Sequence, residues 1–207
     1  MRITKDADER RSEILDISQR LFHEKGYSET TVEDIITECK IAKGTLYYYF
    51  KSKEDILSAI IDRQIDENVI SLTEISIDSS ITATEKLVKV IRLLSQNGVL
   101  DDSLHDPDNS ELHQKTFKRS LLRYTDVLTK ILNEGISSGE FSTPYPKEAV
   151  QLLFCSSQLY DPGVFKWSEE ERYKKVKAFF YTLEVTLGIS PKAKEQLYRI
   201  AGIKKEW

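Results

Sequence analysis

The residues best suited to contact a ligand lie in one short stretch, residues 43–50, with the sequence KGTLYYYF. If this stretch is a helix, Leu46 and Phe50 share one apolar side, because residues four apart lie on the same face. The opposite side then carries a glycine, a threonine and two tyrosines. Glycine lets another backbone approach closely, and hydroxyl groups can donate to phosphate oxygens or touch base edges. This chemistry suits a surface that contacts DNA.

Positive charge gathers at the same place. Residues 40–53 contain four lysines and no acidic residue, whereas the whole chain has a formal net charge of −4. An acidic protein with one basic edge has a local anion site rather than a general polyelectrolyte surface. From charge alone, a solvated lysine-rich corner is the alternative. The candidate DNA contacts in this region are Lys43, Gly44, Thr45, Tyr47, Tyr48, Lys51 and Lys53.

Further helices must position this surface. Thr30 and Glu33 have the spacing of a capping box, which predicts a helix that begins at Thr31. A three-residue corner separates that helix from the one at residues 43–50, and a longer helix is expected before it, at about residues 7–25. One apolar stripe follows the capping box at helical spacing: Val32, Ile35, Ile36 and Cys39.

The rest of the chain has helical patterns throughout. Ser52 is expected to cap a helix that runs to about Thr73. No strand pattern of any length and no internal repeat is found, so the predicted fold class is all-α. The prediction comprises a three-helix helix-turn-helix domain over residues 1–53 and a helical ligand-binding and dimerisation domain over residues 54–207. Helices in the second domain are expected at residues 84–96, 111–135, 146–160 and 168–187, and from Pro191 onward.

Two runs of sequence, KGYSETTVEDI and KGTLYYYFKSKEDIL, closely resemble the DNA-binding domain of the TetR family of bacterial transcriptional regulators. The resemblance is strong over about residues 8–60 and weaker beyond. It implies a homodimer that binds a double-stranded DNA operator. It also implies individual roles: Thr31 caps a helix or touches phosphate, Lys43, Gly44, Thr45 and Tyr47 face the major groove, and Tyr48 and Lys53 hold the DNA backbone.

The chain departs from the family pattern at the corner between the two helices. Lys40 stands where glycine is usual, and a left-handed backbone there costs a non-glycine residue on the order of 1 kcal/mol. Ala42 stands where the family often has a serine N-cap, which loses up to about 1 kcal/mol of helix capping. Cys39 and Ile36 replace small residues at the helix–helix contact. These departures make the unit less ideal, but none removes a DNA contact.

The helices at residues 146–160 and 168–187 are richly apolar. They predict a four-helix homodimer interface, and the alternative is that they fill the chain's own core. A small-molecule effector, apolar or aromatic, is expected to bind in the second domain. The candidate pocket residues, for each of which a plain core role is the alternative, are Leu94, Phe117, Tyr124, Phe154, Tyr160 and Trp167.

Catalytic and metal chemistry find little support. His105, Asp106, Glu111 and His113 lie near one loop, but their spacing matches no strong zinc signature, so no metal site is expected. The chain has no phosphate-binding glycine loop, metalloprotease motif or nucleophile elbow. Neither an enzyme nor a cofactor is therefore expected.

The two cysteines and the hydropathy indicate the compartment. Cys39 and Cys155 lie in unrelated helical patterns, which predicts no disulfide. Cys155 is expected to be an inert core residue, with a redox sensor as the alternative. No apolar run approaches the roughly 20 residues of a membrane span, and the N-terminus lacks the apolar region of a signal peptide. A cytoplasmic location is expected.

The sequence therefore predicts a ligand-responsive transcriptional regulator. Its expected action is that of a repressor, which binds a palindromic operator as a homodimer and is released by a small molecule. A helical protein–protein adaptor that has lost DNA reading is the alternative.

Overall fold

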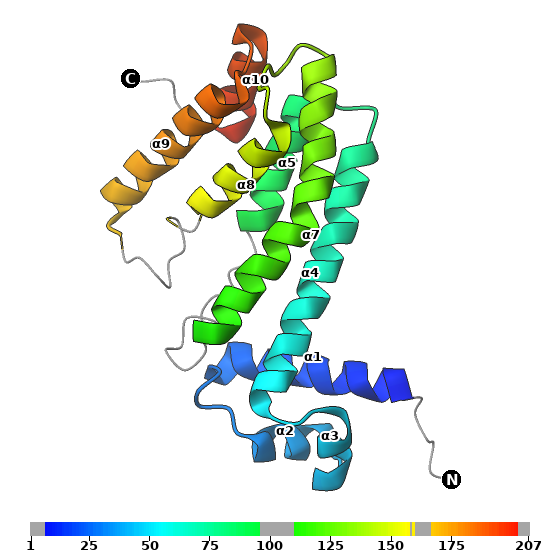
Figure 1. Cartoon of the computed structure of the whole chain (residues 1–207). Helices are drawn as coiled ribbons and strands as arrows, with labels where there is room; N and C mark the ends of the chain where they lie inside the picture. Colours follow the sequence, from blue (N-terminus) through cyan, green and yellow to red (C-terminus); the bar gives the residue numbers. More distant parts are fainter. Residues whose placement is uncertain (1–6, 96–109, 158, 160–166, 203–207) are drawn as a thin grey trace. The chain divides into compact units, whose positions relative to one another are not determined.

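The structure is a computed structural model that describes residues 7–95, 110–157, 159 and 167–202. Within these ranges the regular elements are α-helices and no β-strand occurs, as predicted (Figure 1). None of the helices in this part of the chain is both long and apolar enough to cross a membrane. The described residues divide into two compact units, the first with residues 7–65 and 110–116 and the second with the remainder.

Three helices and the start of a fourth form most of the first unit. The helices α1 (Ala7–Lys25), α2 (Val32–Cys39) and α3 (Lys43–Tyr49) precede the long helix α4 (Lys53–Ile77). Helix α2 packs against both α1 and α3. The apolar sides of these helices are buried, with Ile14, Leu15, Leu21, Ile35, Leu46, Phe50, Ile56, Leu57, Ile60 and Ile61 almost inaccessible to solvent.

The start of α2 corrects the predicted capping box. The N-cap is Thr31, whose Oγ1 accepts from the N–H of Asp34 at 3.1 Å and whose own N–H donates to Asp34 Oδ2 at 2.9 Å. Thr30 is buried instead, and its hydroxyl donates to the carbonyl of Gly26 at 2.7 Å. Both threonines have an acid three residues later, so spacing alone could not choose between them. Burial of the Thr30 hydroxyl decides the register, and Glu33 stays exposed.

The corner between α2 and α3 has the two departures expected from the sequence. Lys40 adopts the left-handed conformation, with φ of 53° and ψ of 42°. Ala42 is the N-cap of α3 and makes no side-chain capping bond. Helix α3 has only seven residues, so the burial of Leu46 and Phe50 is what stabilises it.

Helix α4 begins as predicted and runs further than predicted. The N–H of Asp55 donates to Ser52 Oγ at 3.2 Å, which confirms Ser52 as the cap. The helix continues past Thr73 to Ile77. Its residues up to Ile65 belong to the first unit and those from Asp66 onward belong to the second. The predicted domain boundary after residue 53 stays a prediction.

The second unit contains the end of α4, most of α7 (Ser110–Ser137) and four further helices. The four are α5 (Ala83–Ser95), α8 (Pro146–Ser157), α9 (Glu169–Leu187) and α10 (Pro191–Ala201). Helix α10 packs against α5, and α8 packs against α9. Buried apolar residues of this unit include Leu72, Val88, Ile131, Leu132, Phe141, Phe180, Leu183, Leu187 and Leu197.

Two charged side chains join helices of the second unit over long distances in sequence. Lys86 is almost fully buried, and its Nζ lies 2.6 Å from Glu134 Oε2 and 2.9 Å from the carbonyl oxygen of Ser76. Glu140 Oε2 accepts from the backbone N–H of Thr84 at 2.8 Å and from its hydroxyl at 2.7 Å. Glu140 therefore caps the start of α5 from the turn after α7.

The cysteines are both free, and one of them corrects a prediction. Cys155 was expected in the core but is exposed. Helix α8 buries Ala149 and Val150, and the opposite side of that helix carries Cys155 together with exposed Leu152. Cys39 is buried, and burial raises the pKa of its thiol to about 11.

Candidate nucleic-acid interface

Helix α3 presents the two faces expected from its sequence. Leu46 and Phe50 are 0% and 2% exposed and belong to the core of the first unit. Tyr47 and Tyr48 are 46% and 79% exposed, and the Tyr48 ring meets the Tyr49 ring edge-on with centroids 5.0 Å apart. Two large aromatic side chains therefore stand in solvent on a short helix, where their hydroxyl groups are accessible.

The first turn of α3 is open. Gly44 is exposed, and a Cβ atom added there would meet no atom within 4 Å. Its φ is not in the left-handed region, so neither backbone conformation nor packing within the protein requires glycine. Next to it, Thr45 is half-buried. A glycine that the fold itself does not need is a place where another molecule can approach the helix backbone closely.

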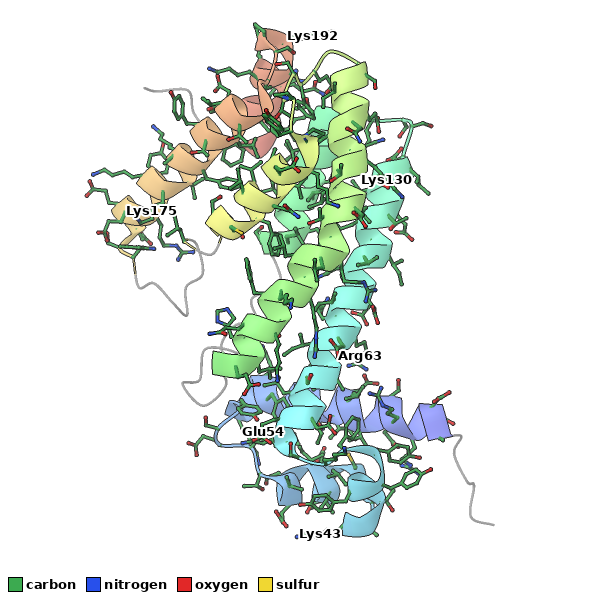
Figure 2. The ribbon with its side chains drawn as sticks, viewed as in Figure 1. Lys43, Glu54, Arg63, Lys130, Lys175 and Lys192 are labelled. Atoms are coloured by element: carbon green, nitrogen blue, oxygen red, sulfur yellow. The ribbon has the colours of Figure 1, made fainter. Side chains whose placement is uncertain are left out.

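Lys43 carries the positive charge at the start of α3 (Figure 2). Its Nζ lies 3.0 Å from Glu33 Oε1 on α2 and 6.0 Å from the ring centroid of Tyr47. The hydrogen bond with Glu33 raises the pKa of Lys43 and lowers the pKa of Glu33. Both side chains are more than 60% exposed, so the pair is weak and an incoming anion can compete for the ammonium group.

The N-terminus of α2 is held by a network around one carboxylate. Asp34 accepts from the N–H of Thr31 at 2.9 Å and from its hydroxyl at 2.8 Å, and from Lys25 Nζ at 3.1 Å. The bonds from Thr31 and Lys25 lower the pKa of Asp34 to about 2. Thr31 is exposed, as a residue that contacts phosphate must be.

The two lysines that follow α3 have different environments. Lys51 is exposed, and its backbone N–H donates to Asp55 Oδ2 at 2.9 Å. Lys53 is half-buried, and its Nζ donates to the backbone carbonyls of Tyr27 and Thr30 at 2.8 and 3.0 Å. Lys53 was grouped with the other candidate DNA contacts, but its ammonium group already has partners within the protein.

Two further charged residues contact α3 or the residue directly after it, and neither contact was predicted. Glu33 was assigned to the capping box, and the structure places it against Lys43 instead. Arg11 was not singled out, and its guanidinium carbon lies 5.2 Å from the ring centroid of Phe50, directly after α3. In the sequence, Arg11 is marked only by its charge, three residues before Ile14, and this does not indicate that it contacts the Phe50 ring.

Three of the six candidate pocket residues come together in the second unit. The ring of Phe154 on α8 stacks on that of Phe117, with centroids 5.4 Å apart, and meets the ring of Tyr124 at 5.9 Å. Tyr124 is buried, burial raises its pKa, and its hydroxyl accepts from Asn68 Nδ2 at 2.9 Å. We call Phe117, Tyr124 and Phe154 the aromatic cluster.

The other three candidate pocket residues are not in this cluster. Leu94 is half-buried on α5. Trp167 donates from Nε1 to the carbonyl of Leu159 at 3.0 Å, and Lys175 Nζ lies 3.8 Å from a Trp167 ring centroid. Tyr160 lies outside the described residues.

The histidine-containing loop is only partly described. His105 and Asp106 lie outside the described residues, whereas Glu111 and His113 lie in α7. Among residues 7–95, 110–157, 159 and 167–202, no group of three or more His, Cys, Asp or Glu side chains is arranged to hold a metal ion.

Comparison with known proteins bears on both units. Residues 14–60 match the family described as "Bacterial regulatory proteins, tetR family", and residues 92–182 match "Tetracyclin repressor-like, C-terminal domain". The first match contains α2, α3 and the start of α4, and therefore the surface described above.

Individual relatives match over most of the chain. The Fatty acid metabolism regulator protein of Bacillus subtilis is 30% identical over 175 residues, which are 79% of this chain and 87% of that protein. The protein described as "Uncharacterized HTH-type transcriptional regulator YuxN" of the same organism is 31% identical over 157 residues, which are 71% of this chain and 52% of that protein. A transcriptional regulator of the TetR/AcrR family from Thermobifida fusca has a solved structure that superposes with a TM-score of 0.61 at 25% identity, covering 86% of this chain and 97% of that one.

Proposed function

We propose that this chain, which belongs to the TetR family of bacterial transcriptional regulators, represses transcription as a homodimer on a palindromic operator. Family membership makes it a DNA-binding regulator and not an enzyme. Repression, homodimerisation and release by a small molecule go beyond that membership. They rest on features of α3, of α8 and α9, and of the aromatic cluster.

The observation that carries the proposal is the outer side of α3. Exposed Tyr47 and Tyr48, open Gly44 and the cation of Lys43 share one short helix, and exposed Lys51 follows it. In helix-turn-helix proteins such a helix enters the major groove, and the two copies in a dimer reach half-sites about 34 Å apart. We expect Lys43, Gly44, Thr45 and Tyr47 to face bases and Thr31, Tyr48 and Lys51 to hold phosphates.

The outward sides of α8 and α9 support a homodimer. Leu152 and Cys155 on α8, and Tyr181 and Val185 on α9, are exposed. Spacings of three and four residues place each pair on one side of its helix, and α8 and α9 pack against each other. Exposed apolar faces on two adjacent helices favour burial against a second copy.

A pair of substitutions tests the dimer. We expect Leu152→Glu combined with Val185→Glu to give monomers in sedimentation at micromolar concentration, whereas wild type sediments as a dimer. Leu122→Glu on α7 is the matched control, because Leu122 is 60% exposed but lies outside the α8 and α9 faces. A monomeric wild type would remove the dimer from the proposal.

The aromatic cluster supports an apolar or aromatic effector. Phe117, Tyr124 and Phe154 offer apolar ring surface, and Asn68 adds an amide beside the Tyr124 hydroxyl. Helix α4 continues from the second unit into the first, so a change in α4 on effector binding would reach the start of this helix near α3. Only a difference in effector affinity between the DNA-binding and released states can drive this change. The name of the Bacillus subtilis relative makes genes of fatty acid metabolism the first ones to test for regulation by this protein.

A gel-shift experiment tests DNA binding. The probe is the promoter DNA next to the protein's own gene, at two salt concentrations. We expect a sharp shift that weakens steeply with salt, because phosphate contacts release counterions from DNA. A protein–protein adaptor would give no shift at either concentration.

A further inference from the structure

The ammonium group of Lys53 has three acceptors in the turn between α1 and α2. Its Nζ lies 2.8 Å from the carbonyl oxygen of Tyr27, 3.0 Å from that of Thr30 and 3.4 Å from that of Ser28. It also lies 4.2 Å from the ring centroid of Tyr27. An ammonium group has three N–H donors, so these three carbonyls can use all of them.

This turn is otherwise constrained from within. Gly26 has φ of 88°, the Thr30 hydroxyl donates to the Gly26 carbonyl at 2.7 Å, and the Thr30 N–H donates to the Tyr27 carbonyl at 3.2 Å. The resulting conformation leaves several carbonyls converging on one point. A cation at that point neutralises their negative ends, and Lys53 supplies it from the first residue of α4.

The position of the Thr30 carbonyl controls the start of α2. This carbonyl and the N–H of Thr31 belong to one planar peptide group, so fixing one orients the other. The Thr31 N–H donates to Asp34 Oδ2 and completes the capping box. Lys53 on one side and Asp34 on the other therefore hold the peptide group that begins α2.

We infer that Lys53 is a positioning residue of the DNA interface and not a phosphate contact. It holds the Tyr27–Thr30 carbonyls, and through them it sets the N-terminus of α2 and the exposed Thr31 that we expect to meet phosphate. This inference rests on the proposed function. It replaces the role that the family resemblance implies for Lys53, and it leaves Lys51, which is exposed on the same edge, as the phosphate contact.

The salt dependence of DNA binding separates the two roles. The full-length protein is titrated with its own promoter DNA over a range of salt concentrations, at a temperature where circular dichroism shows every variant folded. Each phosphate contact contributes about 0.9 to the slope of log affinity against log salt. We expect Lys51→Met to flatten the slope by about 0.9 for each protomer bound.

Lys53→Gln should behave differently. It removes the charge but keeps two N–H donors for the carbonyls, so we expect an unchanged slope and an affinity lowered several-fold at every salt concentration. Lys53→Met, which keeps no donor, should lower affinity further with the same slope, and Lys53→Arg should restore it. Reduced global stability alone would not change the affinity of folded protein.

Two results would overturn the inference. One is a slope for Lys53→Gln that flattens as much as that of Lys51→Met, which would make Lys53 a phosphate contact. The other is wild-type affinity for Lys53→Met, which would remove its positioning role. Failure of the proposed function is separate, because then the wild-type protein itself would show no salt-dependent binding.

Discussion

The Nζ of Lys43 in α3 lies 3.0 Å from Oε1 of Glu33 in α2. The cation at the start of the proposed recognition helix is thus paired with an acid of the neighbouring helix. An operator phosphate must compete with this carboxylate for Lys43. The carboxylate of Glu33 also repels nearby phosphates. Glu33 therefore opposes DNA binding while stabilising the free protein slightly.

Removing this competitor should strengthen DNA binding. We expect Glu33→Gln to bind promoter DNA a few-fold more tightly, because an exposed ion pair contributes about 0.2–1 kcal/mol. The matched control is Glu38→Gln on the same helix, whose carboxylate pairs with Arg20 and not with Lys43. Fluorescence anisotropy measures both affinities. Equal gains in the two variants would mean that only overall charge matters, and not the Lys43 pair.

Gly44→Ala should separate stability from DNA binding. The new methyl group meets no atom of the protein within 4 Å, and alanine stabilises a helix by roughly 0.5–1 kcal/mol relative to glycine. We expect a higher midpoint in urea unfolding but weaker binding to promoter DNA. Gly135→Ala is the contrasting variant and should lower the urea midpoint, because its Cβ would lie 2.2 Å from the Phe141 ring. Undiminished DNA affinity in Gly44→Ala would show that no DNA atom approaches this backbone closely.

Tyr48 and Thr45 should differ in what they contribute to binding. We expect Tyr48→Ala to weaken binding about tenfold on every DNA sequence, because a phosphate contact carries no base information. Thr45→Ala should instead change which operator variants are preferred. Binding selections on randomised operators measure both effects, and Tyr173→Ala, an exposed tyrosine on α9, is the control. A changed sequence preference in Tyr48→Ala would contradict the assignment.

Much of the first unit could be predicted from the sequence because its signals are local. The apolar stripe, the Ser52 cap and the side of α3 that carries Tyr47 all depend on residues within about two helical turns of one another. The position of Lys53 depends on carbonyls more than twenty residues away, which no helical period encodes. The prediction that Cys155 lies in the core was wrong for a related reason: apolar residues occur on both the buried and the exposed side of α8.

Thiol labelling should report on the α8 face. Cys155 is exposed, whereas Cys39 is buried with a pKa of about 11 and has little reactive thiolate. We expect one fast and one slow thiol at nanomolar protein concentration. Because a dimer through α8 and α9 would cover Cys155, its labelling should slow as the concentration rises to micromolar. Cys155→Ser identifies the fast thiol, and a rate independent of concentration would contradict the proposed interface.

The capping box of α2 should make stability depend on acid pH. The pKa of Asp34 falls from its ordinary 3.8 to about 2 in the folded chain, so the unfolded chain binds a proton more readily. The stabilisation from this carboxylate is then complete above pH 3.8 and is lost as the pH falls through about 2. Between pH 7 and acid pH, the free energy of unfolding should therefore fall less in Asp34→Ala than in wild type. Glu29→Ala, outside the capping box, should retain the wild-type difference.

Helix α3 has fewer than two full turns, follows a strained Lys40 and begins without a side-chain cap. A helix this short is not stable by itself in water, so the packing of Leu46 and Phe50 in the core keeps it folded. A fluctuation that exposes Leu46 and Phe50 would unfold the surface that carries Tyr47 and Tyr48. A substitution that weakens the packing of Leu46 or Phe50 would therefore lower affinity for an operator even though neither side chain touches DNA.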